Sequence, residues 1–170
     1  GEFKKGKWDG KGIYTSNSQG IYVGEFKDNA RNGQGVNTWT SGHVYDGEWL
    51  ANQQHGQGVT TFSNGSRYEG QYKNGKRHGH GIMKFADGGF YEGEWKNDKW
   101  HGKGVVTWSN GDVYKGQFEY GLMHGQGVTT FSNGSRYEGQ FKNDLFDGLG
   151  IATLPDGSSW NGTFMNGNPT

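Results

Sequence analysis

The chain has 170 residues, no formal net charge at pH 7 and no cysteine. The charge balance provides no basic footprint for nucleic acid, and the lack of cysteine excludes disulfides and thiolate metal sites and fits a reducing compartment. No apolar run approaches the ~18 residues that span a bilayer and no signal peptide is visible, so we expect a cytoplasmic location, with peripheral attachment to cytoskeleton or membrane.

From Tyr22 onward, one pattern recurs every 23 residues without an insertion or deletion. Each repeat begins with an aromatic residue, glycine follows two residues later, and a second aromatic residue comes two residues after that. A short fixed period is typical of one supersecondary unit stacked on copies of itself. The predicted array covers 1–170, with a partial repeat at 1–21, full repeats at 22–44, 45–67, 68–90, 91–113, 114–136 and 137–159, and a partial repeat at 160–170.

We number the positions of each repeat 1 to 23, with Tyr22 at position 1. Residue types alternate at positions 1, 3 and 5 and again at positions 12, 14, 16 and 18, and a period of two predicts strands. Between these strands, position 8 is Asn, Asp or Gly, which suits a turn between positions 6 and 11. Positions 20 and 21 are Asn-Gly or Asp-Gly in most repeats, as in Asn64-Gly65, and this pair predicts a hairpin turn in which both residues can take a positive φ.

No segment shows helical periodicity, so each repeat is predicted to be one β-hairpin. The expected fold class is all-β: an elongated single-layer repeat solenoid of stacked antiparallel β-hairpins, with a 23-residue period and about fourteen strands. At ~4.8 Å per strand, each repeat advances the sheet by ~10 Å, which predicts a rod of roughly 65–70 Å.

Glycines at positions 3 and 14 lie among the aromatic residues of one sheet face. Glycine weakens a strand, but it leaves room for rings of neighbouring strands to lie flat over the backbone. We therefore expect a concave groove floored by rings, suited to a helix or an extended peptide of a protein partner. The predicted protein-binding residues are Tyr45, Trp49, Tyr68, Tyr72, Tyr91, Trp95, Tyr114, Phe118, Tyr137 and Phe141.

Loop positions 9 and 10 change character along the chain. Early repeats carry Ala30-Arg31, Gln53-Gln54 and Lys76-Arg77, whereas later repeats carry Lys99-Trp100, Leu122-Met123 and Leu145-Phe146, which are mostly apolar. Apolar loop tips along one edge indicate a partner site or self-association, here an isologous homodimer through the C-terminal repeats; the alternative is that these side chains fold back over the sheet edge. The predicted patch is Trp100, Leu122, Met123, Leu145 and Phe146.

A second candidate ligand is an anionic phospholipid such as a phosphoinositide. Basic residues near the start and in the third full repeat could each contribute ~1 kcal/mol at an anionic leaflet, although acidic residues match the basic ones in number. The candidate headgroup residues are Lys4, Lys5, Lys7, Lys73, Lys76 and Arg77.

Catalysis, cofactors and metals are not expected. The histidines at position 11 (His55, His78, His101 and His124) lie in repeats ~10 Å apart, whereas zinc needs ligands within ~2.1 Å of one point, so we interpret them as bonding the adjacent turn backbone. Gly-x-Gly strings do not open a helix and so bind no phosphate. Position 4 is Glu in some repeats and Gln in others, and Gln is no general acid or base.

The motif Tyr91-x-Gly93-x-Trp95, followed by His101-Gly102-x-Gly104 and Asn110-Gly111, resembles the MORN repeat. The resemblance covers essentially the whole chain. The departures lie toward the ends: Asn32 and Asp147 replace the loop histidine, Ser16 replaces the aromatic residue at position 18, and Gln19 replaces the turn glycine.

This resemblance implies a non-catalytic scaffold at a membrane-cytoskeleton junction. The alternatives are a phospholipid-binding module and a targeting or regulatory repeat domain of a larger enzyme, such as a phosphatidylinositol phosphate kinase or a lysine methyltransferase. The chain starts and stops within a repeat, so we expect it to be a segment of a longer array. Residues 55–71 and 124–140 are identical, which indicates duplication in blocks of three repeats.

Overall fold

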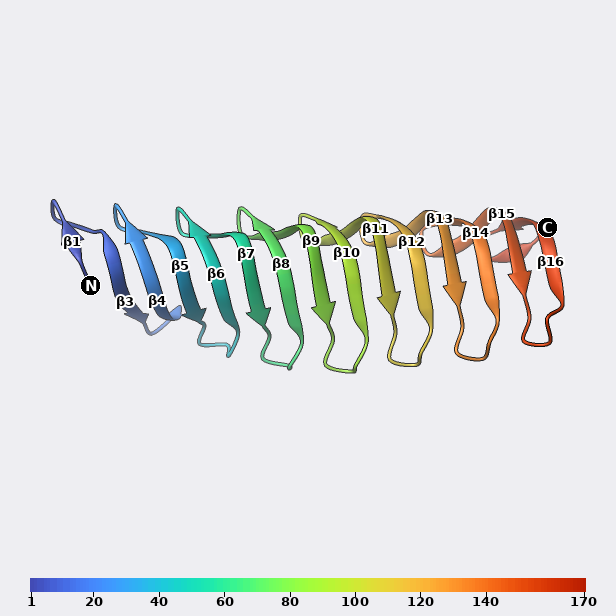
Figure 1. Ribbon diagram of the computed structural model, residues 1–170, viewed down its shortest axis with the longest axis horizontal. Coiled ribbons are helices and arrows are strands. Elements are labelled where there is room, and N and C mark those ends of the chain that lie inside the picture. Colours follow the sequence, from blue (N-terminus) through green and yellow to red (C-terminus); the bar gives the residue numbers. More distant parts are fainter. The chain divides into compact units, whose positions relative to one another are not determined.

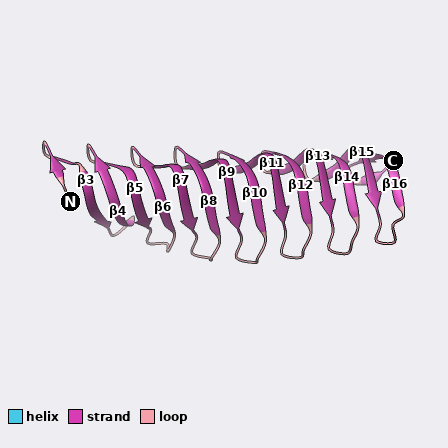
Figure 2. Cartoon of the chain, in the orientation of Figure 1, coloured by secondary structure: helices cyan, strands magenta, loops and turns pink.

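The structure, a computed structural model, describes residues 1–170 and consists of strands and turns without a helix (Figure 2). No helix that could cross a membrane is therefore present. The chain divides into a first compact unit, Gly1–Ala86, and a second, Asp87–Thr170.

The first unit contains β1 (Phe3–Lys4), β2 (Lys7–Trp8), β3 (Gly10–Ser16), β4 (Gly20–Lys27), β5 (Ala30–Thr38), β6 (Val44–Leu50), β7 (Gln53–Thr61), β8 (Arg67–Lys73) and β9 (Lys76–Lys84). The second contains β10 (Phe90–Lys96), β11 (Lys99–Thr107), β12 (Val113–Glu119), β13 (Leu122–Thr130), β14 (Arg136–Lys142), β15 (Leu145–Thr153), β16 (Ser159–Met165) and β17 (Asn168–Pro169).

Sheet order follows chain order in each unit. From β3 to β9, and again from β10 to β17, every strand pairs antiparallel with the next (Figure 1), while β1 and β2 form a separate two-stranded ribbon. Without the two-residue strands β1, β2 and β17, 14 strands remain. The structure confirms the predicted all-β, single-layer solenoid of stacked antiparallel hairpins.

The tight turns differ in type from the prediction. The two-residue turn in which both residues have positive φ occurs at positions 7 and 8, as in Asp28 (φ 50°) and Asn29 (φ 70°). At positions 20 and 21 only the glycine is left-handed: Gly65 has φ 89°, whereas the Asn64 side chain accepts a hydrogen bond from Ser66 N at 3.0 Å. The Asn-Gly signal therefore located a turn correctly but was wrong about its geometry, because the asparagine stabilises the turn through its side chain.

Glycines allow the rings to lie against the backbone, as expected. A Cβ at Gly58 would overlap the ring of Tyr45 on the neighbouring strand. A second glycine row, at position 12, has positive φ, as in Gly56 (φ 55°), and lies where each hairpin shifts register. A side chain at Gly56 would meet the Glu48 carboxylate.

The core is one ring thick and lies on one face of the sheet, here called the ring face. Tyr22, Tyr45, Tyr68, Tyr91 and Tyr114 at position 1 are 0% exposed. Tyr45 meets Trp49 of its own repeat edge-to-face at 5.1 Å and Tyr72 of the next repeat at 5.1 Å. Because such pairs contribute ~0.5–1.5 kcal/mol each beyond area burial, a chain of them can replace a thick aliphatic core.

Candidate interaction surface

The tyrosine hydroxyls of position 1 are used by the fold. Tyr22 Oη donates to the backbone oxygen of Glu25 at 2.9 Å, and Tyr45 Oη donates to that of Glu48 at 2.8 Å. Burial raises the pKa of Tyr22 to about 12 and also raises the pKa of Tyr45, since the charged phenolate would be poorly solvated there. These groups therefore stay neutral and hold the bend of each hairpin.

All ten aromatic residues predicted to line an open groove are buried. Their exposed fractions lie between 0% for Tyr45 and 6% for Tyr72. The glycines of positions 3 and 14 let the rings sink onto the backbone, which buries them. A partner at the ring face would first meet the side chains that cover these rings.

Those covering side chains come from position 10. This position pairs with position 5 across the hairpin, as in Trp95 with Trp100, so both lie on the same face. In the second unit Trp100 stacks on Tyr91, with ring centroids 4.4 Å apart and planes 8° apart, and Phe146 stacks on Tyr137 at 3.8 Å and 13°. We call the half-buried position-10 side chains the ring-face row: Arg31, Gln54 and Arg77 in the first unit, and Trp100, Met123 and Phe146 in the second.

In the first unit the ring-face row is polar. The guanidinium carbon of Arg31 lies 4.4 Å from the Trp49 ring centroid and 5.7 Å from that of Tyr22. Arg77 lies over Tyr68 at 5.8 Å. Gln54 occupies the position between the two arginines, so the row carries two positive charges.

The five residues of the predicted self-association patch lie on two faces. Trp100, Met123 and Phe146 belong to the ring-face row. Leu122 pairs with Glu119 and Leu145 with Lys142, at positions 9 and 6 on the far face, and the two leucines are 38% and 45% exposed. Successive strand residues point to opposite faces, so positions 9 and 10 do not form one tip. Trp100 and Phe146 do fold back over the rings, which was the alternative interpretation.

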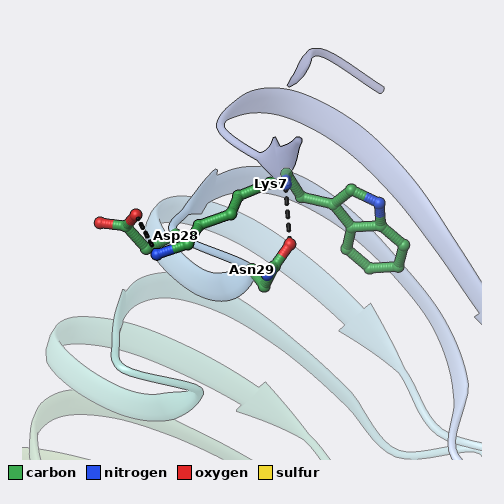
Figure 3. Close-up of polar contacts among 4 residues, drawn as sticks. Lys7, Asp28 and Asn29 are labelled. Atoms are coloured by element: carbon green, nitrogen blue, oxygen red, sulfur yellow. Dashed lines mark hydrogen bonds and ion pairs between the residues drawn. The ribbon is translucent and has the colours of Figure 1, made fainter. Parts of the chain in front are cut away.

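The six candidate headgroup residues are also separated. Lys4 pairs directly with Lys7, and Lys73 with Lys76, at the ends of their hairpins. Lys7 Nζ donates to Asp28 Oδ1 at 3.0 Å (Figure 3), and in the same turn Trp8 N donates to Asn29 Oδ1 at 2.8 Å. Lys5 has a positive φ of 51° in the β1–β2 turn. Arg77 is on the ring face, away from its lysine neighbour Lys76.

At position 11 two histidines leave a ring nitrogen unpaired, whereas the Glu and Gln side chains at position 4 bond the backbone of the sheet. Nδ1 of His55 and of His78 is buried without a hydrogen-bond partner, so this nitrogen makes no bond to the turn backbone. Glu48 Oε1 accepts from Gln57 N at 2.7 Å, and Gln71 Oε1 accepts from His80 N at 3.0 Å. Glu and Gln thus accept the same kind of backbone hydrogen bond, in line with the expected sheet-bonding role. No group of three or more potential ligands could hold a metal ion.

Sequence reasoning missed a hollow of about 610 Å³ on the far face of the first unit. Its apolar lining includes Ile13, Val23 and Val36, which pair with one another across β3, β4 and β5. The signal was present at position 2, where Val23 stands and later repeats carry charged or polar residues, such as Asp46.

Several solved structures are similar to this chain. The TCP domain of SAS-4 (dCPAP) from Drosophila melanogaster, in complex with a proline-rich motif of Ana2 (dSTIL), has a TM-score of 0.48 and 11% identity over 91% of this chain and 90% of that one. The TCP10 domain of Danio rerio CPAP with a STIL peptide has a TM-score of 0.41 and 14% identity, covering 90% and 83%. Similarity at this level carries no information about binding here. No curated protein matches the chain.

The MORN repeat family matches consecutive segments over residues 1–159: 1–21, 22–44, 45–67, 68–90, 91–113, 114–136 and 137–159. MORN repeats are interaction repeats for proteins and membranes. With hairpin after hairpin built on the same buried tyrosine and the same glycines, the chain belongs to the MORN-repeat family.

Proposed function

We propose that the chain is a non-catalytic scaffold that binds a protein partner, as a helix or an extended peptide, over the ring face of the second unit. The observation that carries this proposal is the apolar ring-face row of Trp100, Met123 and Phe146. The six buried aromatic residues of the same unit support this surface from below: Tyr91, Trp95, Tyr114, Phe118, Tyr137 and Phe141.

Two of the three members of the row are already packed on the core before a partner binds. Trp100 and Phe146 are stacked on buried tyrosines, so their binding costs little side-chain entropy. Successive members of the row are one repeat apart, ~10 Å along the sheet. A helix advances by about that distance in seven residues and a strand in three, so a regularly spaced series of apolar side chains could meet the row.

Peptide selection on the whole chain, with helical and extended libraries, tests this proposal. The affinity of a selected peptide is then measured for two double variants. The ring-face pair is Trp100→Gln with Phe146→Gln, and the matched far-face pair is Leu122→Gln with Leu145→Gln. Gln53 and Gln54 occupy the same two positions in an earlier repeat, so both pairs are expected to fold. We expect the ring-face pair to weaken binding by about tenfold or more, as for buried aromatic anchors, and the far-face pair to leave it unchanged.

Equal losses in the two pairs, or none in the first, would contradict the proposal. The same variants test homodimerisation through residues 114–170, which we propose as one use of this surface. If the dimer contact includes the residues of one pair of substitutions, sedimentation should give a monomer for that double variant.

Phosphoinositide binding is a second candidate, favoured by the lysine pairs Lys4–Lys7 and Lys73–Lys76. Like charges directly opposite on a hairpin are unfavourable without a ligand. Loss of binding to phosphoinositide vesicles in Lys73→Gln with Lys76→Gln would support it, and unchanged binding would contradict it. Under either candidate we propose work at a membrane-cytoskeleton junction, alone or as a targeting or regulatory domain of a larger enzyme.

A further inference from the structure

Arg31 in the first unit is a half-buried cation held in a fixed position. Its guanidinium carbon lies 4.4 Å from the centroid of Trp49. Nη1 donates to Asn37 Oδ1 at 3.1 Å, and Nη2 donates to the backbone oxygen of Asn52 at 3.2 Å. The plane of the guanidinium is therefore set by contacts from three sides.

No carboxylate pairs with this cation. Desolvation lowers the pKa of Arg31, and the groups that act against this are the hydroxyls of Tyr22 and Tyr14. Removing a positive charge from water is unfavourable unless an anion or enough hydrogen bonds replace the water. The fold does not need arginine here, because Gln54 fills the same position in the next repeat.

The acidic strand residues of the first unit lie away from the ring face, on the far face, which also carries Arg67 and Lys73. The acidic residues at positions 2 and 4, such as Asp46 and Glu48, alternate with the buried ring-face residues and so lie on the far face. Arg77 adds a second guanidinium to the ring-face row, over Tyr68 at 5.8 Å. The ring face of this unit thus offers positive charge.

We propose that the ring face of the first unit binds an acidic protein segment whose carboxylates pair with Arg31 and Arg77. A guanidinium has five N–H donors, and Arg31 uses two of its nitrogens within the chain, so N–H groups remain for a carboxylate. The two arginines are two repeats apart, ~19 Å along the sheet, which an extended peptide spans in about six residues.

This inference extends the proposed interaction role to another part of the chain and another ligand chemistry. A peptide is favoured over a lipid headgroup because the guanidinium lies among rings and backbone rather than at a hairpin tip with the lysines. The two proposals fail independently, since one depends on Trp100 and Phe146 and the other on Arg31 and Arg77.

The probe is a labelled, end-capped peptide, Glu-Thr-Val-Thr-Val-Thr-Glu, with a control peptide that has Gln at both ends. Fluorescence anisotropy at low salt, where screening is weak, gives the affinity for the whole chain and for Arg31→Gln, Arg77→Gln, Arg31→Lys and Lys73→Gln. Lys73→Gln removes one exposed positive charge away from the ring face and is the matched control. Circular dichroism verifies that each variant is folded.

We expect Arg31→Gln to weaken binding of the acidic peptide by about tenfold or more, as for a lost charged hydrogen-bond pair. Arg31→Lys should weaken it less, and Lys73→Gln should change it by less than about twofold. The Gln peptide should bind the unaltered chain no better than the acidic peptide binds Arg31→Gln.

Four results would overturn the inference. The unaltered chain could fail to bind the acidic peptide, Arg31→Gln could bind it equally well, or Lys73→Gln could lose as much affinity as Arg31→Gln, which would indicate general charge attraction. Binding to phosphatidylcholine–phosphatidylserine vesicles that depends on Arg31 while the peptide does not bind would assign the site to a lipid surface instead.

Discussion

In the first unit the ring-face row is Arg31, Gln54 and Arg77, whereas in the second the same position carries apolar side chains, with Trp100 and Phe146 stacked on the tyrosines beneath. The buried rings and the hairpin geometry are alike in both units. Position 10 lies on the core without being part of it, so it can change from cation to indole while the fold stays the same. One position of the repeat therefore sets whether the ring face is polar or apolar.

A closer comparison comes from the identical segments 55–71 and 124–140. Thr60 Oγ1 shares a 2.6 Å hydrogen bond with the hydroxyl of Tyr72, but Thr129 Oγ1, its counterpart, is buried without a partner. The reason lies just outside the identical segment, where Phe141 stands in place of Tyr72. Identical sequences thus have different energetics because the neighbouring residue supplies or withholds a hydroxyl.

The largest expected effect tests what the two units share. Gly58→Ala and Gly127→Ala each place a Cβ into a buried tyrosine ring, Tyr45 in the first unit and Tyr114 in the second. We expect each to lower the free energy of unfolding by about 3 kcal/mol, the upper range for overpacking. Urea unfolding measures this loss. Gly65→Ala is the control: it has open space but φ 89°, so it should cost about 1 kcal/mol. A loss of stability in Gly58→Ala no greater than in the control would show that the tyrosine ring moves aside to accommodate the added Cβ.

The next effect should separate the duplicated segments. Tyr72→Phe leaves Thr60 unsatisfied, so we expect unfolding to become easier by about 1–2 kcal/mol. Phe141→Tyr should supply Thr129 with its missing partner and stabilise the chain by about 1 kcal/mol. Thermal unfolding of these two variants and of Thr129→Val measures the loss of stability at Thr60 and the gain at Thr129. If Phe141→Tyr destabilises the chain, the second unit lacks room for the hydroxyl and the two pockets are not equivalent.

A smaller effect concerns the turns at position 7. Tyr120 has φ 55°, a conformation that suits Asn and Gly, and its ring is 71% exposed. Asn143 occupies the same position in the following repeat with φ 50°. Tyr120→Asn should therefore stabilise the chain by about 0.5–1 kcal/mol, and Asn143→Tyr should destabilise it by a similar amount. Equal stability in all three chains would mean that the tyrosine ring compensates for its strain through local contacts.

The sequence predicted the strands, the repeat and the aromatic face, because Tyr-x-Gly with a second aromatic residue restricts all three. It predicted an open groove on that face, whereas the rings are buried. It did not predict which side of the sheet Trp100 and Leu122 would occupy. Assigning the tight turn to Asn64-Gly65 left positions 9 and 10 in a loop, where neighbours share a tip. In the structure the strand pairing starts directly after the two-residue turn at Asp28-Asn29. Position 10 therefore pairs with position 5 and lies on the same face of the sheet. The missing information was the turn type. The hydrogen bond that the Asn64 side chain accepts decides this turn type, and no residue pattern in the sequence reveals that bond.

The smallest expected effect compares two exposed aspartates whose pKa values are lowered by different partners. The hydrogen bond from Lys7, and then its charge, lower the pKa of Asp28 from the ordinary value of 3.8. For Asp112 in the second unit the first cause is the backbone N–H of Ser132, which donates to Oδ1 at 2.8 Å. In both cases the folded-state pKa is depressed, so the stabilisation is present above the unfolded-state value and is lost as the pH falls through the folded-state value. Because these groups are exposed and screened, the change in global stability should be too small to detect.

The carboxyl resonances report these interactions directly. In an NMR titration between pH 2 and pH 6, we expect Lys7→Gln to return the pKa of Asp28 toward 3.8 and to leave Asp112 unchanged. Raising the salt concentration should have the same selective effect, since screening weakens an ion pair more than a backbone hydrogen bond. If Asp28 keeps its depressed pKa in Lys7→Gln, then the turn backbone stabilises this carboxylate as it does in the second unit, and the ribbon β1–β2 is held to β4 by the bond from Trp8 N to Asn29 without help from the ion pair.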